Sequence, residues 1–286
     1  MKAFRSTIPL ALLLLAGSLL AVASPPKLKF TFKTVEVRGA QSTQVFGTNN
    51  AGVLVGSYVD NVGTRHGFKL ASGKLTTIDD PNGSDTFCFA INKSGAIVGY
   101  YAISNQTAQA FLYSNGKFTD LNPPGATGSQ AIGINDAGHV NGNFADSASS
   151  HAFLYDGAKY TTIDVPGALA TLGGGINNAG LLTLVWIDSE GNAESSLYDG
   201  KKYTTIDIPR EENSDAGGIS NKKDIVYSWE DASDDYGAAL RHAGKYYKFT
   251  VPRSARTFGY GINDKSVVVG TYVDANGVMK GFEAKY

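Results

Sequence analysis

The residues best suited to chemistry are charged side chains that lie where an internal repeat loses its regularity. Two loops that each follow a proline carry most of them, and one more acid follows shortly afterwards. These residues are Arg210, Glu211, Glu212, Asp215, Arg253 and Arg256. Carboxylates can act as the acid and base of glycoside cleavage, and arginines can bind an acidic sugar. Because no motif fixes their geometry, the sequence singles out no catalytic residue, and an enzyme stays an alternative only.

The two tryptophans of the chain occupy one position of the repeat. Trp186 and Trp229 lie near the end of the second strand that we expect in their units, where the other units carry Tyr or Phe. An indole ring has a broad apolar face and a polar edge, which suits stacking on a sugar. The same ring suits packing against a neighbouring unit, and both interpretations stay open. The charged loops and the two tryptophans form the candidate binding cluster.

These residues are positioned by a motif that recurs about every 43 residues. A proline after a Thr-rich strand marks the end of each unit. The prolines are Pro81, Pro124, Pro166, Pro209 and Pro252, with Arg38 in the same place one period earlier. A fixed period of this length predicts stacked or radially arranged units, none of which buries its apolar face alone.

Each unit reads as four short strands. In the third unit we expect strands at 130–134, 140–144, 152–155 and 160–165. Helical periodicity is absent, the chain has 34 glycines, and Thr, Val, Ile and Tyr fill the strands. Four strands in a unit of this length are typical of a propeller blade.

The two ends of the chain complete each other. A fourth strand at 30–37 opens the repeats, and strands one to three within 260–286 end them, so that residues 29–286 span 258 residues, or six periods of 43. An open solenoid gains nothing from this division, whereas a closed ring is locked by it. The sequence therefore predicts an all-β, six-bladed β-propeller of four-stranded antiparallel blades, closed by an N-terminal strand that completes the last blade.

Several positions of the repeat, which we call columns, keep one residue type. A turn after the first strand has Asn in five units and Ser220 in the other, and Asn favours such turns by bonding the local backbone. The third strand carries a large apolar residue in most units. This column is predicted to be Phe68, Phe111, Phe153, Leu240 and Phe282, with Ser196 as the exception.

Two further columns carry oxygen. The acids are Asp60, Asp146, Asp188, Asp231 and Asp274, two residues past the aromatic column. The hydroxyls are Thr43, Thr86, Ser129, Thr171, Ser214 and Thr257, before each first strand. We expect the carboxylates to accept hydrogen bonds from these hydroxyls or from nearby amides. One carboxylate per unit is few for Ca²⁺, which takes about 6–8 oxygens, so no metal site is predicted.

Residues 1–23 read as a signal peptide, and residues 24–286 as a single propeller domain. Lys2 and Arg5 precede an apolar run at 8–20 and a small-residue cleavage pattern at 21–23. Removal of this leader leaves 23 basic and 26 acidic residues, a net charge of −3. No basic stripe is present, so we expect neither nucleic acid nor a membrane surface as partner. Cys88 is the only cysteine and reads as a small buried hydrophobe.

One motif is familiar. His151-Ala152-Phe153-Leu154-Tyr155, with Gly133-Ile134-Asn135 ahead of it, resembles the bacterial extracellular HAF repeat family. The resemblance covers all units, is weaker in the fourth and fifth, and implies an exported β-rich repeat protein without any assigned catalytic residue. We therefore predict a secreted or periplasmic, monomeric, noncatalytic binding or scaffold protein without cofactor, whose propeller face binds a glycan or a protein. The alternatives are a polysaccharide lyase or hydrolase and a purely structural envelope or matrix protein.

Overall fold

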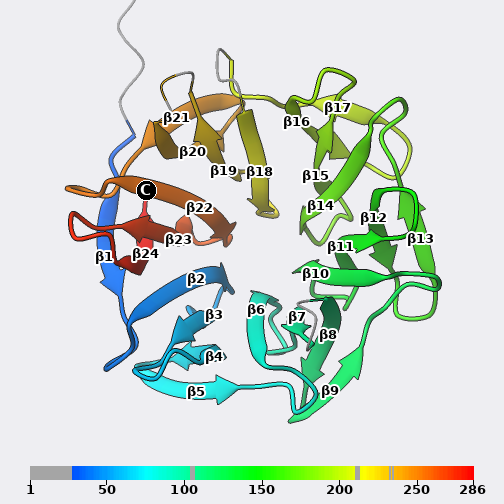
Figure 1. The fold of residues 1–286 in the computed structure, drawn as a ribbon. Coiled ribbons are helices and arrows are strands. Elements are labelled where there is room, and N and C mark those ends of the chain that lie inside the picture. The colour runs from blue at the N-terminus through cyan, green and yellow to red at the C-terminus, as the bar shows by residue number, and fades with distance from the viewer. Residues whose placement is uncertain (1–27, 104–106, 210–212, 232, 234) are drawn as a thin grey trace, which may run out of the picture.

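The chain forms a closed ring of six four-stranded antiparallel sheets around a central axis (Figure 1). This confirms the predicted six-bladed β-propeller. The computed structural model describes residues 28–103, 107–209, 213–231, 233 and 235–286, and the predicted leader lies outside them. In every blade the first strand lies next to the axis (Figure 1). The described part of the chain contains no helix, and hence no helix that could cross a membrane.

The strands follow one another from the axis to the rim in each blade. Blade 1 comprises β2 (Ser42–Thr48), β3 (Leu54–Val59), β4 (Arg65–Ala71) and β5 (Lys74–Ile78). Blade 2 comprises β6 (Asp85–Ile91), β7 (Ile97–Ala102), β8 (Ala108–Ser114) and β9 (Lys117–Asp120). Blade 3 comprises β10 (Gly128–Ile134), β11 (Val140–Ala145), β12 (Ser150–Tyr155) and β13 (Tyr160–Ile163).

The second half of the ring repeats this order. Blade 4 comprises β14 (Ala170–Ile176), β15 (Leu182–Ile187), β16 (Ala193–Tyr198) and β17 (Tyr203–Thr205). Blade 5 comprises β18 (Asn213–Ile219), β19 (Ile225–Glu230), β20 (Tyr236–His242) and β21 (Lys245–Phe249). Blade 6 comprises β22 (Arg256–Ile262), β23 (Val267–Val273), β24 (Met279–Lys285) and, from the other end of the chain, β1 (Thr31–Val35).

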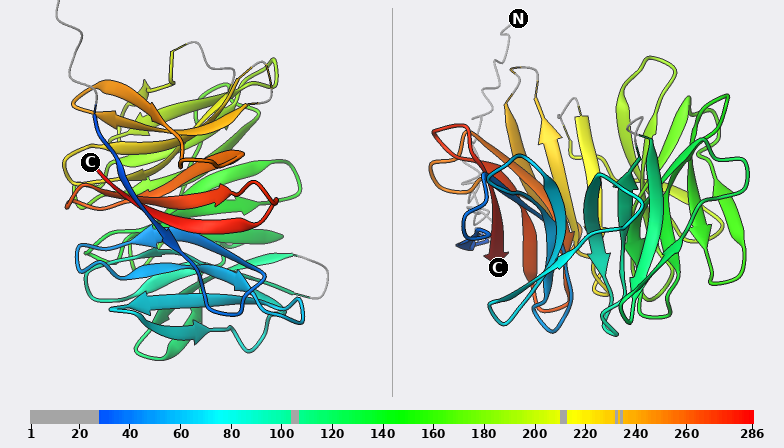
Figure 2. Two further views of the ribbon diagram at one scale, coloured as in Figure 1. Left: turned by 90° about the vertical axis from the view of Figure 1, so that its left-hand side faces the viewer. Right: turned by 60° about the horizontal axis from the view of Figure 1, so that its bottom comes forward.

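The ring closes as predicted, through β1. This strand pairs antiparallel with β24, with Phe32 opposite Ala284 and Thr34 opposite Phe282 (Figure 2). The rings of Phe32 and Phe282 lie 6.1 Å apart, and Lys33 forms an ion pair with Glu283. The closing strand is therefore held by backbone pairing and by apolar contact together.

Large and small residues alternate across the second and third strands of a blade. Gly56 lies opposite Phe68, and a Cβ on Gly56 would come within 2.9 Å of the Phe68 ring. In blade 5 the large residue is on the second strand and the small one on the third, because Tyr227 lies opposite Ala239 and both are fully buried. The prediction that Leu240 belongs to the phenylalanine column was therefore wrong. Side-chain size alone misplaced it by one residue, onto the other face of the sheet.

The two oxygen columns bond to backbone amides rather than to each other. In five units the hydroxyl of the first strand accepts the amide hydrogen of the residue six positions earlier, as Thr171 does from Val165. The acids cap their own turns, as Asp146 does by accepting from the amides of Ala148 and Ser149. The amide partners of the acids were thus expected correctly, but the hydroxyls are not their partners.

Candidate functional site

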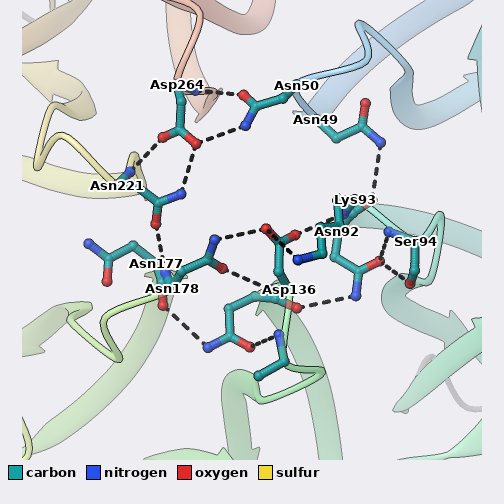
Figure 3. A network of polar contacts seen from close by, with 12 residues as sticks. Asn49, Asn50, Asn92, Lys93, Ser94, Asp136, Asn177, Asn178, Asn221 and Asp264 are labelled. Carbon is teal, nitrogen blue, oxygen red and sulfur yellow. Dashed lines mark hydrogen bonds and ion pairs between the residues drawn. The ribbon is translucent and has the colours of Figure 1, made fainter.

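A ring of asparagine side chains surrounds one end of the central channel (Figure 3). Each side-chain amide donates to the backbone carbonyl of its counterpart in the next blade, over 3.0–3.3 Å. The residues are Asn49, Asn92, Asn135, Asn177 and Asn263, and Ser220 interrupts the ring. Each Asn oxygen meanwhile accepts amides of its own turn, so that the column predicted to form turns also joins the blades.

A second polar ring lies one residue further along each turn (Figure 3). Backbone amides in five blades donate to a side-chain oxygen of the next blade, over 2.7–2.9 Å. The acceptors are Asp136, Asn178, Asn221, Asp264 and Asn50. The remaining place belongs to Lys93, whose ammonium group cannot accept a hydrogen bond. Because these side chains bond to one another, they join the blades around a small cavity of about 90 Å³ at this end of the channel.

The middle of the channel is apolar. A chamber of about 150 Å³ is lined on one side by the rings of Phe46, Phe89 and Tyr260, and on the other by glycines such as Gly217 and Gly218. The rings of Phe46 and Phe89 stack at 4.6 Å. The aromatic residues come from blades 6, 1 and 2 and the two glycines from blade 5, so the channel wall does not follow the sixfold symmetry of the backbone.

A recess of about 270 Å³ lies between blades 5 and 6, where β18 begins. Around the axis β18 and β22 are neighbours (Figure 1). The lining residues of this recess, which we call the blade 5/6 recess, are Asn213, Asp215, Ser228, Trp229, Glu230, Tyr236, Phe258 and Tyr260. Tyr260 lines the apolar chamber as well, so the recess and the channel share a wall.

Strand alternation explains which side chains point into the recess. In blade 5, Asp215 pairs with Ser228, and Glu230 lies between Asn213 and Tyr236 on its two neighbouring strands. Residues that lie opposite each other in antiparallel strands share a face, and successive residues alternate between faces. These polar side chains therefore face blade 6, where Ser228 donates to the Gly259 carbonyl.

The two carboxyl groups of the recess are held differently. Glu230 accepts hydrogen bonds from the Asn213 amide, at 3.4 Å, and from the Tyr236 hydroxyl. Within the described residues, no hydrogen bond or ion pair engages the carboxylate of Asp215. Desolvation by the surrounding protein raises the pKa of Asp215, and the negative charge of Glu230 adds to this rise. Glu230 is thus fixed, whereas Asp215 is available to a guest.

Aromatic rings form the opposite wall. The ring of Tyr236 lies 5.9 Å from that of Phe258, and the rings of Phe258 and Tyr260 lie 6.4 Å apart with their planes 11° from parallel. Burial, together with the charge of Asp215, raises the pKa of Tyr260 to about 12, so its hydroxyl stays protonated at neutral pH. The guanidinium carbon of Arg256 lies 4.6 Å from the centre of the Tyr236 ring, at the margin of the recess.

The residues singled out in the sequence are dispersed by the fold. Asp215 and Trp229 line the blade 5/6 recess, and Arg256 lies at its margin. Arg253 is exposed in the turn after β21 and does not line the recess. Arg210, Glu211 and Glu212 lie outside the described residues.

The indole rings of both tryptophans pack between blades, which was one of the two open interpretations. Trp229 donates to the Ala238 carbonyl at 3.1 Å and packs with Ile206 and Ile208 of blade 4. Trp186 donates to the Ser196 hydroxyl and joins the cluster between blades 3 and 4. Alternation along β19 turns the Trp229 ring away from the face that carries Ser228 and Glu230. Trp186 therefore lies outside the recess, and Trp229 lines it without turning its ring toward the polar side chains.

Sequence reasoning missed most of the recess. Asn213, Glu230, Tyr236, Phe258 and Tyr260 belong to columns that vary from unit to unit. The available signal was the alternation of side chains between the two faces of a strand. It places Glu230 on the face opposite the buried Tyr227, and so toward the recess. Among the described residues, no group of three or more His, Cys, Asp or Glu side chains is arranged to hold a metal ion.

Known structures share this fold. No family model matches the chain, and no curated protein resembles it in sequence. A mutant of the Aleuria aurantia lectin in complex with α-methyl-L-fucoside matches with a TM-score of 0.54 and 11% identity, over 88% of this chain and 93% of the lectin. The SapL1 lectin in complex with α-methyl fucoside matches with a TM-score of 0.57 and 12% identity, over 85% and 93%.

A lyase has the same architecture. A catalytically inactive virginiamycin B lyase from Staphylococcus aureus, with quinupristin, matches with a TM-score of 0.53 and 12% identity, over 90% of this chain and 100% of that one. At these identities the comparisons establish the fold alone. A propeller supports both binding and catalysis, so function has to be argued from the recess.

Proposed function

We propose that this protein is an exported, noncatalytic glycan-binding propeller that holds a sugar in the blade 5/6 recess. The observation that carries this proposal is the meeting of two carboxyl groups, Asp215 and Glu230, with three aromatic rings in one cavity. Propeller lectins in complex with fucosides have the same fold and support a carbohydrate as the ligand. The leader and the resemblance to HAF repeats support export.

The recess offers both kinds of contact that a sugar needs. The C–H faces of a pyranose stack on aromatic rings, and its hydroxyl groups donate to carboxylates. Glu230 is held in place by Asn213 and Tyr236 before any ligand arrives, which reduces the entropy lost on binding. Asp215 supplies an acceptor without a competing partner inside the described chain.

A glycan array probed with residues 24–286 tests this proposal. We expect binding to a defined set of glycans, and loss of at least about tenfold in affinity for Tyr236→Ala, because one stacking ring and one donor to Glu230 disappear. Tyr198→Ala is the matched control, since this half-buried tyrosine lies on the third strand of blade 4 and stacks on Tyr203, away from the recess. An array without any binder would contradict the proposal and favour a purely structural protein.

N-terminal sequencing of secreted material tests export, with Ser24 as the expected first residue.

One observation favours a hydrolase or lyase as a second candidate. The raised pKa of Asp215 beside the carboxylate of Glu230 resembles the arrangement in which one carboxyl group donates a proton and the other acts as a base or nucleophile. Product analysis of the bound oligosaccharides distinguishes the two functions. Cleavage by the wild type that disappears in Asp215→Asn would identify an enzyme, whereas intact glycan after prolonged incubation is the result that we expect.

A further inference from the structure

We propose that the sugar bound in the blade 5/6 recess carries a positive charge, as an amino sugar with a free ammonium group does. This inference rests on the proposed function and specifies its ligand class. Two of the lining side chains are acids, and none of the described lining residues is basic. A ligand that supplies the missing cation would balance these charges.

The contacts of the two carboxylates assign the ammonium group to Asp215. Glu230 already accepts from two donors, whereas Asp215 has no partner among the described residues. Asp215 is exposed at the recess, but desolvation by the surrounding walls and the charge of Glu230 raise its pKa and so disfavour its ionisation when no ligand is bound. An ammonium group beside it reverses this penalty, because it favours the carboxylate and forms a charge-assisted hydrogen bond.

The aromatic wall favours the same ligand. A cation over the face of Tyr or Phe gains about 0.5–2 kcal/mol, more where water is excluded. The Tyr236 ring already has a cation against it, the guanidinium group of Arg256 at the margin of the recess. The rings of Phe258 and Tyr260 have no described cation over them. They are therefore available to a cationic group that enters the recess beside Asp215.

The size of the recess limits the ligand. Pockets for drug-sized molecules measure roughly 300–1,000 Å³, and this one measures about 270 Å³. It therefore suits a single terminal sugar rather than a segment inside a chain. Acidic sugars are disfavoured by Asp215 and Glu230, and an N-acetylated sugar loses the charge while keeping the ring.

Calorimetry with three matched oligosaccharide series tests the inference: glucosamine oligomers, their N-acetylated forms and uronic acid oligomers. At pH 6 we expect the glucosamine series to bind at least about tenfold more tightly than the N-acetylated series, which corresponds to about 1.4 kcal/mol. Asp215→Asn should remove this preference while reducing binding of the N-acetylated series less than threefold. Asp85→Asn is the matched control, because Asp85 begins the first strand of blade 2, outside the recess.

The dependence of affinity on pH and salt provides a second measurement. Affinity for glucosamine oligomers should rise with pH above the ordinary range of an aspartate, as Asp215, whose pKa is raised, loses its proton. Glu230, Tyr236, Tyr260 and Arg256 are the other titratable groups around the recess. Affinity should fall when salt increases from 50 to 500 mM, since ionic attraction is screened. Equal or tighter binding of the N-acetylated or uronic acid series would overturn this inference and leave glycan binding intact. Absence of binding in all series would contradict the proposed function as well.

Discussion

The two ends of the propeller channel differ in how far the six blades carry the same residue type at equivalent positions. At the end surrounded by the asparagine ring, five blades carry the same residue and each bonds to its neighbour. At the other end, the position that follows the hydroxyl residue of each first strand changes from blade to blade. It reads Gln44, Phe87, Gln130, Leu172, Asp215 and Phe258.

This difference teaches where a symmetric fold can acquire a specific site. A residue that bonds to its own counterpart in the next blade cannot change alone, because a buried donor or acceptor would lose its partner. A residue of the variable position makes no bond to its counterpart in the next blade and can change alone. The blade 5/6 recess is formed from residues of this second kind, and its ligand preference follows from their local chemistry.

Opening the ring should have the largest effect on both ends. Deletion of residues 24–38 removes β1, with Val35 and Val37 buried and Phe32 packed against Phe282. Each buried apolar side chain contributes about 1.5–3 kcal/mol, so we expect a loss of at least about 5 kcal/mol or an insoluble chain. Chemical denaturation measures the loss. An unchanged midpoint would mean that β1 does not close the ring.

Breaking the asparagine ring should have the next largest effect. In Asn92→Ala the Asn135 carbonyl loses a donor, and the amides of Ser94 and Ala96 lose their acceptor. Because these groups are buried or partly buried, we expect a loss of about 2–4 kcal/mol, read as a lower melting temperature.

Two variants accompany this measurement. Asn276→Ala changes an exposed asparagine in a turn of blade 6 and should shift the melting temperature little. Ser220→Asn places an amide where the ring is interrupted and should stabilise by about 0.5–1.5 kcal/mol through a bond to the Asn263 carbonyl. If Asn92→Ala and Asn276→Ala have the same melting temperature, the asparagine ring does not stabilise the contact between blades.

A smaller effect should come from Glu194, which replaces a basic residue found at this place in other blades. In blade 1 His66 lies between Asp60 and Asp79, and in blade 6 Lys280 lies between Asp274 and Glu36. Blade 4 places Glu194 near two acids instead. A hydrogen bond with Asp207, desolvation and the charges of Asp207 and Asp188 raise the pKa of Glu194 to about 7.

The direction of the resulting pH dependence follows from proton uptake. The folded state binds more protons than the unfolded state between the unfolded pKa, about 4.3, and the folded one. The free energy of unfolding should therefore fall as pH rises from about 4.5 to 7, by about 1 kcal/mol after allowance for solvent screening. Glu194→Gln should flatten this dependence, whereas Glu190→Gln, in an exposed turn, should keep it. Identical pH profiles for wild type and Glu194→Gln would contradict the assignment.

The ring architecture was predictable because each unit repeats its turn and strand residues in the same order. Phe32 and Phe282 could be placed side by side from the division of one unit between the chain ends. The recess was not predictable, because Asp215 and Glu230 meet the rings of Phe258 and Tyr260 only through the packing of two blades. The role of Trp229 stayed open for a physical reason: a large aromatic residue is as well suited to filling the space between blades as to binding a sugar.

The most direct test of the account compares two phenylalanines at one position of the repeat. Phe258 lines the recess, and Phe87 occupies the same place in blade 2, half-buried and outside it. Calorimetry with the best glycan from the array should show at least a tenfold loss of affinity for Phe258→Ala and less than a twofold change for Phe87→Ala. Equal effects of the two substitutions would contradict a binding site between blades 5 and 6.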